Sequence, residues 1–269
     1  MMIGANFPDI DIIAAPFGRA TEFRRGWTHG VLALVVLPFV LTGLMLLWNR
    51  YRRGSRTDVL PKQVLLLSTI AIWTHPTLDW MNSYGLRWLM PFDGTWFYGD
   101  SLFIVDPYLL GILGLGVFLS RRNDMPARVA VGVATAYILT MLGLQNFSET
   151  RVRNDLAETG HGRQKLVVTA SPANPFKWRV YGDDGRAYWR GTFDVPGSRL
   201  SMNPMPLNKG ADNPVVISAM QSPDARAFLD WARLPFYRVE GGAVRMTDAR
   251  YGLSISVPVV PEDSVVMER

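Results

Sequence analysis

The sequence predicts a polytopic α-helical membrane domain at about residues 1–147, followed by a soluble α+β domain at 148–269. Two observations support this fold class. Apolar residues concentrate in four runs, about 31–48, 64–80, 102–120 and 127–147, each near the roughly 20 residues that a membrane-spanning helix needs. After Ser148 the composition becomes that of an ordinary soluble domain.

The basic residues set the expected orientation of these helices. Arg50, Arg52, Arg53, Arg56 and Lys62 lie in the short loop after the first run, and Arg121, Arg122 and Arg128 lie after the third. Short loops rich in Lys and Arg stay in the cytoplasm. We therefore expect the N-terminus, residues 81–101 and the C-terminal domain on the outer side of a bacterial inner membrane. This placement explains the net charge of +5 without a nucleic-acid partner.

The start of the chain and the absence of cysteine limit which targeting signals and which catalytic chemistries the sequence allows. Met1 is followed by Pro8, Asp9 and Asp11, not by a basic segment and an apolar core. We expect no cleavable signal peptide, so that the first apolar run directs insertion. The sequence contains no cysteine, which excludes thiol nucleophiles, thiolate metal sites and disulfides. It also lacks a Gly-x-Ser-x-Gly motif, which argues against serine hydrolase chemistry.

Local signals define the expected membrane elements in order. Pro38 lies inside the first run and predicts a kink that neighbouring helices can accommodate. Residues 81–101 are rich in aromatic rings, which is typical of an interfacial segment. Glycines between Gly111 and Gly116 in the third run would allow close helix contact. We expect the fourth helix to end near Phe147.

The C-terminal part alternates apolar and polar residues, which predicts strands together with one helix. Asp183-Asp184-Gly185 predicts a hairpin turn. Ser222 is a good N-cap for the helix. The expected strands are 165–170, 177–181, 187–195, 244–246 and 253–257, and the expected helix is 222–234.

His75 and Asp79 are the strongest candidates for metal ligands. They stand four residues apart near the end of the second run, where an ionisable group costs roughly 2.5–3.5 kcal/mol to insert. On a continuous helix this spacing places both side chains on one face. Pro76 biases His75 away from helix, so the alignment requires a helix that is kinked and not broken. The alternative is a His–Asp hydrogen bond at a helix end.

Asp9 and Asp11 are further candidate ligands on the expected outer side. In an extended segment they would point in opposite directions. We therefore expect one of them to ligate the metal while the other caps Arg24 or Arg25. The alternative is that both belong to a polar turn.

His29, Arg25 and Asp106 complete the candidate site. His29 directly precedes the first apolar run, and Thr28 either caps that helix or orients the His29 ring. Arg25 is a candidate clamp for phosphate or carboxylate, with contact to lipid head groups as the alternative. Asp106 is a candidate general base or further ligand. Its alternative role is an N-cap, because Pro107 follows it at a favourable first helical position.

Taken in order, these motifs resemble the YdjM-type family of bacterial inner-membrane proteins, which are classed as metal-dependent hydrolases. The motifs are Pro8-Asp9-Ile10-Asp11, Arg25-Gly26-Trp27-Thr28-His29, His75-x-x-x-Asp79, Asn82-Ser83-Tyr84-Gly85 and Asp106-Pro107. Residues 174–179 and 248–251 are similar to the soluble tail of some members. Members usually open with a helix carrying an Asp-x-x-Thr-His element and have His where Arg24 stands, and this chain departs from both patterns.

The resemblance implies a hydrolase whose metal activates water at the outer membrane face. His29, His75, Asp79 and either Asp9 or Asp11 would hold a divalent ion such as Zn²⁺, Mn²⁺ or Mg²⁺. Position at the membrane favours a lipid or phosphoester substrate. The alternative is a non-catalytic membrane scaffold whose helices are locked by the ion or by ion pairs. His161 is expected to be solvated and inactive.

Overall fold

The computed structural model describes residues 2–11, 25–53, 59–160, 164–203, 205–252 and 254–258. Arg24, Arg56, His161 and Leu253 lie outside these ranges. The chain divides into two compact units. One consists of Met1–Thr150 with Val168–Trp178, and the other of Arg151–Val167 with Arg179–Arg269.

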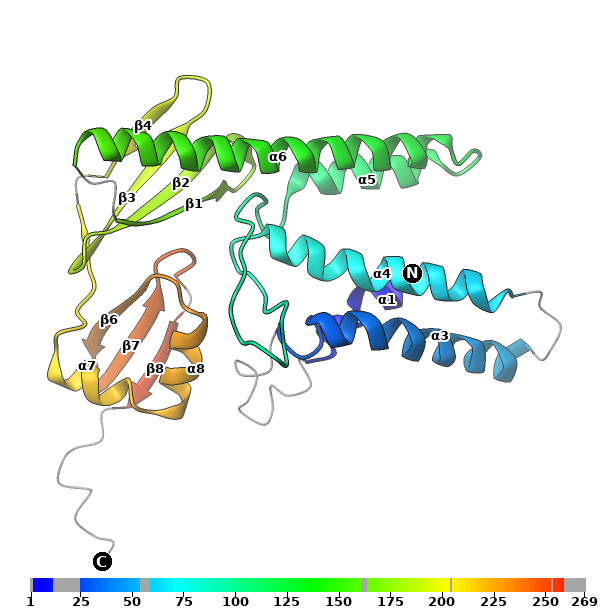
Figure 1. Cartoon of the computed structure of the whole chain (residues 1–269), viewed down its shortest axis with the longest axis horizontal. Helices are drawn as coiled ribbons and strands as arrows, with labels where there is room; N and C mark the ends of the chain where they lie inside the picture. The colour runs from blue at the N-terminus through cyan, green and yellow to red at the C-terminus, as the bar shows by residue number, and fades with distance from the viewer. Residues whose placement is uncertain are drawn as a thin grey trace, which may run out of the picture. The chain divides into compact units, whose positions relative to one another are not determined.

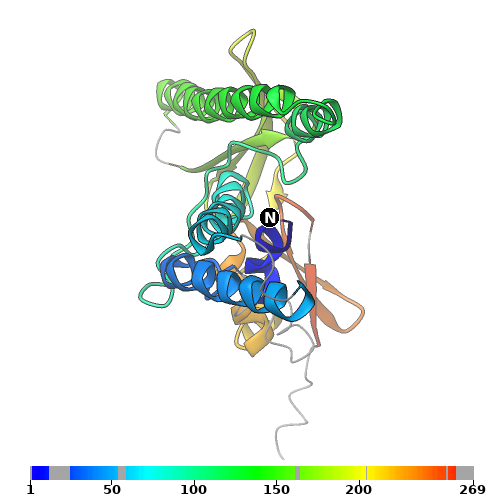
Figure 2. The ribbon, with the colours of Figure 1, turned by 90° about the vertical axis from the view of Figure 1, so that its right-hand side faces the viewer.

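Helices dominate the first unit (Figure 1). Their bounds are Met2–Asn6 for α1, Val31–Arg53 for α3, Pro61–Met81 for α4, Pro107–Leu119 for α5 and Met125–Glu158 for α6. Both α3 and α1 pack against α4. Figure 2, which looks along the helices, shows α5 and α6 side by side. The C-terminal ends of α3 and α5 point toward the same end of this unit (Figure 1).

Within the described part of the chain, two helices are long and apolar enough to cross a membrane, Val31–Arg52 and Met125–Glu158. The expectation of four spanning helices is therefore not supported. Helix α5 has 13 residues. At 1.5 Å per residue it reaches about 20 Å, which is short of the roughly 30 Å hydrocarbon core. Helix α4 has sufficient length, but His75, Thr77 and Asp79 make its last turns polar.

Apolar side chains cover the outer surfaces of the candidate spans. Phe39 and Leu47 on α3 are 61% and 65% exposed, and Leu139 on α6 is 63% exposed. Extended apolar surface of this kind marks a membrane or partner contact. Helix α6 also continues past Phe147, the expected end, to Glu158. The prediction of its end was wrong because Ser148–Glu158, although polar, contains no helix breaker.

Close packing between α5 and α6 depends on Gly116. A Cβ atom added there would lie 2.2 Å from the Cβ of Ala130, so even alanine would force the helices apart. The predicted role of glycine in helix contact is thus confirmed at this position. At Gly111 and Gly114 an added Cβ would meet no described atom within 4 Å.

The C-terminal part is rich in β-structure, as expected. One sheet has the strand order β1-β2-β3-β4, with β5 also paired to β3, and the other has the order β6-β7-β8. The strand bounds are Lys165–Ser171 for β1, Asn174–Asp183 for β2, Ala187–Asp194 for β3, Arg199–Met202 for β4, Leu207–Asn208 for β5, Pro235–Glu240 for β6, Ala243–Asp248 for β7 and Ser254–Pro258 for β8. The sequence patterns do not predict β4, β5 or β6. These strands are short, or begin directly after a helix, and so carry weak alternation.

Two short helices, α7 (Pro214–Ala219) and α8 (Pro223–Trp231), precede the second sheet. Ser222 is the N-cap of α8, because its side chain accepts a hydrogen bond from the backbone N–H of Ala225. The prediction of this helix and of its cap is confirmed. The predicted turn is also confirmed, since Gly185 has a φ of +99° and its N–H donates to Asp183 Oδ1.

Candidate metal centre

Helix α4 brings His75 and Asp79 together at the end opposite to its start at Pro61. The helix continues through Pro76, so the two side chains remain on one face one turn apart. His75 Nε2 lies 3.4 Å from Asp79 Oδ2. The requirement that the proline should not break the helix is therefore met.

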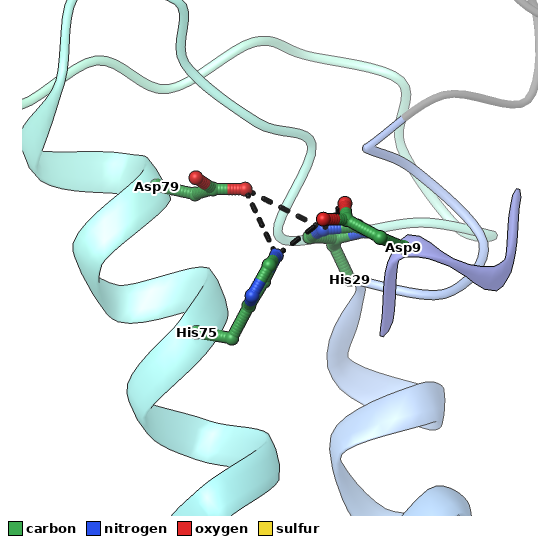
Figure 3. A group of neighbouring side chains, drawn as sticks. All are labelled: Asp9, His29, His75 and Asp79. Atoms are coloured by element: carbon green, nitrogen blue, oxygen red, sulfur yellow. Dashed lines mark ion pairs between the residues drawn. The ribbon is translucent and has the colours of Figure 1, made fainter. Parts of the chain in front are cut away.

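His29 and Asp9 approach the same point from other parts of the chain (Figure 3). His29 lies two residues before the start of α3 and is fully buried. Its Nε2 lies 3.5 Å from Asp79 Oδ2 and 3.7 Å from Asp9 Oδ1. His75 Nε2 lies 3.4 Å from Asp9 Oδ1. One ligand atom from each of Asp9, His29, His75 and Asp79, hereafter the His–Asp cluster, lies within 4.8 Å of every other.

The separations in the His–Asp cluster fit a cation better than direct hydrogen bonds. Distances of 3.4–3.7 Å are longer than good N–H···O bonds. Ligand atoms held about 2.1 Å from a tetrahedral ion lie about 3.4 Å apart. Within the described residues, His29 Nε2, His75 Nε2 and Asp79 Oδ2 are buried without a hydrogen-bond partner. Such atoms are costly to bury, and one shared cation would satisfy all three.

Asp9 differs from the other members in being the accessible one. Its side chain is 51% exposed, whereas that of Asp79 is 14% exposed. The neighbouring His75 side chain lowers the pKa of the Asp9 carboxyl below its ordinary value, against the opposing effect of burial. Asp9 is therefore an anion at neutral pH, as a ligand must be.

Asp11 lies behind His29 and outside the His–Asp cluster. Its Oδ2 accepts hydrogen bonds from the Arg25 backbone N–H at 2.9 Å and from the Thr28 hydroxyl at 3.2 Å. Thr28 Oγ1 in turn lies 2.9 Å from His29 Nδ1. The structure thus separates the two carboxylates, with Asp11 binding the backbone N–H of Arg25 and Asp9 facing His75. Residues 8–11 form a 3₁₀ turn and not the extended segment that the alternation argument assumed.

Arg25 pairs with a carboxylate inside the protein. Its Nη2 lies 3.0 Å from Asp79 Oδ1, which leaves Asp79 Oδ2 directed at the histidines. Its guanidinium also lies 4.3 Å from the centre of the Tyr84 ring. The residue has a φ of +53°, an uncommon conformation for a side chain with a Cβ. Arg25 therefore holds one oxygen of Asp79 and frees the other.

Asp106 is the N-cap of α5 and lies apart from the His–Asp cluster. Its Oδ1 accepts from the N–H groups of Tyr108 and Leu109 at 3.0 and 2.9 Å. Its Oδ2 accepts from the hydroxyl of Tyr137 at 2.8 Å. Asp106 and Asp79 line the same pocket of about 260 Å³. The role of Tyr137 as a partner of Asp106 was not predicted from the sequence. The signal that could have indicated it is a polar hydroxyl within the apolar run of α6.

The candidate spans and the His–Asp cluster define a helical membrane protein with a candidate metal centre. The family model for the YdjM inner membrane protein matches residues 1–147, which contain the whole cluster. The chain belongs to the YdjM inner membrane protein family, and the resemblance seen in its motifs is confirmed.

A curated relative extends the similarity beyond the helical part. The chain is similar to the uncharacterized protein YfhP of Bacillus subtilis (strain 168), with 22% identity over 262 residues. The match covers 93% of this chain and 76% of that protein. The search of solved structures gives no significant match.

Proposed function

We propose that the protein is a membrane-bound, metal-dependent hydrolase that acts at the outer face of the inner membrane on a lipid or phosphoester substrate. One observation carries the proposal, namely the convergence of three buried ligand atoms without a hydrogen-bond partner among the described residues, His29 Nε2, His75 Nε2 and Asp79 Oδ2. Two imidazoles with carboxylates and no thiolate suit Zn²⁺, Mn²⁺ or, with more oxygen ligands, Mg²⁺. The family and the candidate spans support a membrane location.

The residues around the His–Asp cluster have distinct roles in this proposal. A divalent cation held by Asp9, His29, His75 and Asp79 would supply Lewis acidity and a nucleophile at neutral pH. Arg25 orients Asp79 and retains further N–H donors for an anionic group of the substrate. Asp106 lines the same pocket as Asp79 and is the candidate general base. A carboxylate has about four acceptor sites, so Asp106 Oδ2 can accept a proton beside its bond to Tyr137.

The proposed orientation follows from the basic residues. Arg50 and Arg52 end α3, and Arg121 and Arg122 directly follow α5. These ends of α3 and α5 lie on the same side of the helical unit (Figure 1), and His29 lies near the opposite end of α3, two residues before its start. Basic segments of this kind stay in the cytoplasm. The cluster would then face the outer side, and the C-terminal domain would be extracytoplasmic.

Elemental analysis of the detergent-purified full chain tests the metal site. We expect near-stoichiometric metal in the wild type and its loss in a His75→Ala, Asp79→Ala double variant. Asp124→Ala is the matched control, because Asp124 is an exposed carboxylate that pairs with Arg128 outside the cluster. Absence of metal from the wild type after reconstitution with Zn²⁺ or Mn²⁺ would overturn the site.

Activity separates the hydrolase from its alternative. The metal-loaded wild type should hydrolyse a phosphodiester probe such as bis(p-nitrophenyl) phosphate or a phospholipid in vesicles, whereas the double variant should not. A non-catalytic membrane scaffold is the alternative, favoured by the buried Arg25–Asp79 ion pair, which links α4 to the segment before α3. Stoichiometric metal and loss of stability on ligand removal, without hydrolysis of either probe, would support the scaffold.

A further inference from the structure

An apolar groove lies between three helices of the first unit. It has a volume of about 480 Å³ and is lined by α4 between Ile70 and Met81, by α5 at Leu109 and Leu113, and by α6 between Val131 and Ile138. This volume is within the roughly 300–1,000 Å³ typical of small-molecule sites. Helix α6 is a candidate membrane span, so the groove runs beside a segment that is long and apolar enough to cross the bilayer.

The polar groups that line the groove are already satisfied. Its threonines donate their hydroxyl hydrogens to carbonyl oxygens of their own helices, Thr74 to Ala71 at 3.0 Å, Thr77 to Trp73 at 2.7 Å and Thr135 to Val131 at 2.8 Å. The indole N–H of Trp73 donates to the carbonyl oxygen of Leu34 at 3.0 Å. The threonine hydroxyls therefore need no partner in the groove, and its chemistry suits a hydrocarbon ligand.

The length of the groove matches one leaflet of a bilayer. From Ile70 to Met81 it follows α4 for about 16 Å at 1.5 Å per residue. Half of the roughly 30 Å hydrocarbon core is about 15 Å. A single acyl chain that descends from the membrane surface would therefore lie against α4 along its length.

The groove leads to the candidate metal centre. Leu78 and Leu109 line both the groove and the pocket of about 260 Å³ that Asp79 and Asp106 share. The groove and the pocket that contains the carboxylates of Asp79 and Asp106 thus adjoin, and Leu78 directly precedes the candidate ligand Asp79. A lipid whose chain lay in the groove would have its head-group end beside Asp79 and Asp106.

We propose that the groove binds one acyl chain of a membrane lipid, and that the substrate of the candidate metal centre is this lipid, cleaved at its head-group end. The second part rests on the proposed hydrolase function, whereas binding of the chain does not. The occupant is inferred to be a lipid and not a second copy of this protein because the groove is the length of one leaflet and adjoins the pocket that Asp79 and Asp106 line.

Photocrosslinking tests the binding. The full chain is reconstituted in phosphatidylethanolamine vesicles that contain phosphatidylglycerol with a diazirine on one acyl chain, and labelled peptides are identified by mass spectrometry. We expect labelling of the groove residues of α4 and α5 to exceed that of Phe39 and Leu47 on α3, which are exposed but line no part of the groove. Equal labelling of the two sets would mean ordinary lipid contact and would overturn the proposal.

Two tryptophan variants of α6 sharpen this test. Thr135→Trp fills the groove and should reduce groove labelling to the level of α3. Val133→Trp is the matched control, because Val133 is 48% exposed on the same helix and does not line the groove. Unchanged labelling in Thr135→Trp would contradict the proposal. If Thr135→Trp fails to fold, the ratio of groove labelling to α3 labelling in the wild type still decides the question. An unlabelled groove in a dimeric protein would identify a second copy as the occupant and overturn the proposal.

The same experiment separates failure of the groove from failure of the hydrolase. Labelling is repeated in the His75→Ala, Asp79→Ala variant and is expected to persist, because chain binding does not use the metal. Groove labelling without bound metal in the wild type would retain the lipid site and reject the proposed function. Bound metal in the wild type, with equal labelling of the groove residues and of α3, would reject the lipid site and retain the metal centre.

Discussion

Thr28 Oγ1 lies 2.9 Å from Nδ1 of the adjacent residue His29. The Thr28 hydroxyl has one hydrogen, which it donates to Asp11 Oδ2. Its contact with His29 must therefore use an Nδ1–H donor. In the neutral ring this leaves the lone pair on Nε2, the atom that faces Asp79 and Asp9. The Asp11–Thr28–His29 chain thus sets the tautomer that a metal ligand requires.

This chain of hydrogen bonds predicts that a change at Thr28 weakens metal binding although every candidate ligand remains in place. Thr28→Val preserves the shape of the side chain and removes its hydroxyl. Loss of such an orienting partner typically lowers metal affinity about 10–100-fold. The measurement is competition for Zn²⁺ against a chromophoric chelator, with Thr28→Ser expected to restore affinity. Wild-type affinity in Thr28→Val would show that the hydroxyl does not orient His29.

A bound cation should stabilise the helical unit. The ion would satisfy buried atoms of α4 and of the segment before α3, so it would bind the folded protein selectively. At a free concentration of about 100 times Kd, binding adds about 2.7 kcal/mol to the free energy of unfolding. Thermal unfolding in detergent with Zn²⁺, Mn²⁺ and Mg²⁺ measures this effect as a rise in Tm. An equal rise in the His75→Ala, Asp79→Ala variant would locate the stabilising ion elsewhere.

Two substitutions of Asp106 distinguish its structural and chemical roles. Asp106→Ala removes the N-cap of α5 and should cost about 1 kcal/mol of stability. Asp106→Asn keeps a good capping group and should unfold at nearly the wild-type denaturant concentration. If Asp106 is also the general base, Asp106→Asn should lose hydrolysis while retaining metal. Full activity in a stable Asp106→Asn variant would show that Asp106 acts only as a helix cap and not as the general base.

The C-terminal unit depends on a buried ion pair that is unrelated to the candidate metal centre. Asp248 and Arg250 are both fully buried at the side chain, and Arg250 Nε lies 2.9 Å from Asp248 Oδ1. Asp248 Oδ2 also accepts from Arg250 Nη2 and from the Arg233 backbone N–H, each at 2.9 Å. Asp248→Asn would leave the Arg250 charge buried without its counter-ion. We expect a loss of about 3–5 kcal/mol in the free energy of unfolding.

Urea unfolding followed by tryptophan fluorescence measures this loss, because the Arg250 guanidinium lies 5.1 Å from the centre of the Trp231 ring. Glu240→Gln is the matched control. Glu240 and Arg245 form an ion pair in which both side chains are 55% exposed, so its loss should change stability by less than about 0.5 kcal/mol. Similar effects of the two substitutions would contradict the assigned importance of the buried pair.

Local rules were sufficient to predict many elements of this protein from its sequence. The caps at Asp106 and Ser222 and the turn at Gly185 depend on residues within a few positions of each other. The number of spanning helices was overestimated, because an apolar run reports hydrophobicity and not the length of the helix that forms. Between Leu102 and Asp106 the chain is not helical, which leaves α5 too short to span.

The sequence by itself determined which residues were available for a metal centre and that His75 and Asp79 would share a face of any helix continuing through Pro76. Only the tertiary structure decided that His29 and Asp9 meet them, that Asp11 lies behind His29, and that Arg25 holds Asp79. Helical spacing is a property of the local backbone and can be read along the chain. The meeting of distant segments depends on how α1, α3 and α4 pack, which is set by side-chain shape and burial over the whole helical unit.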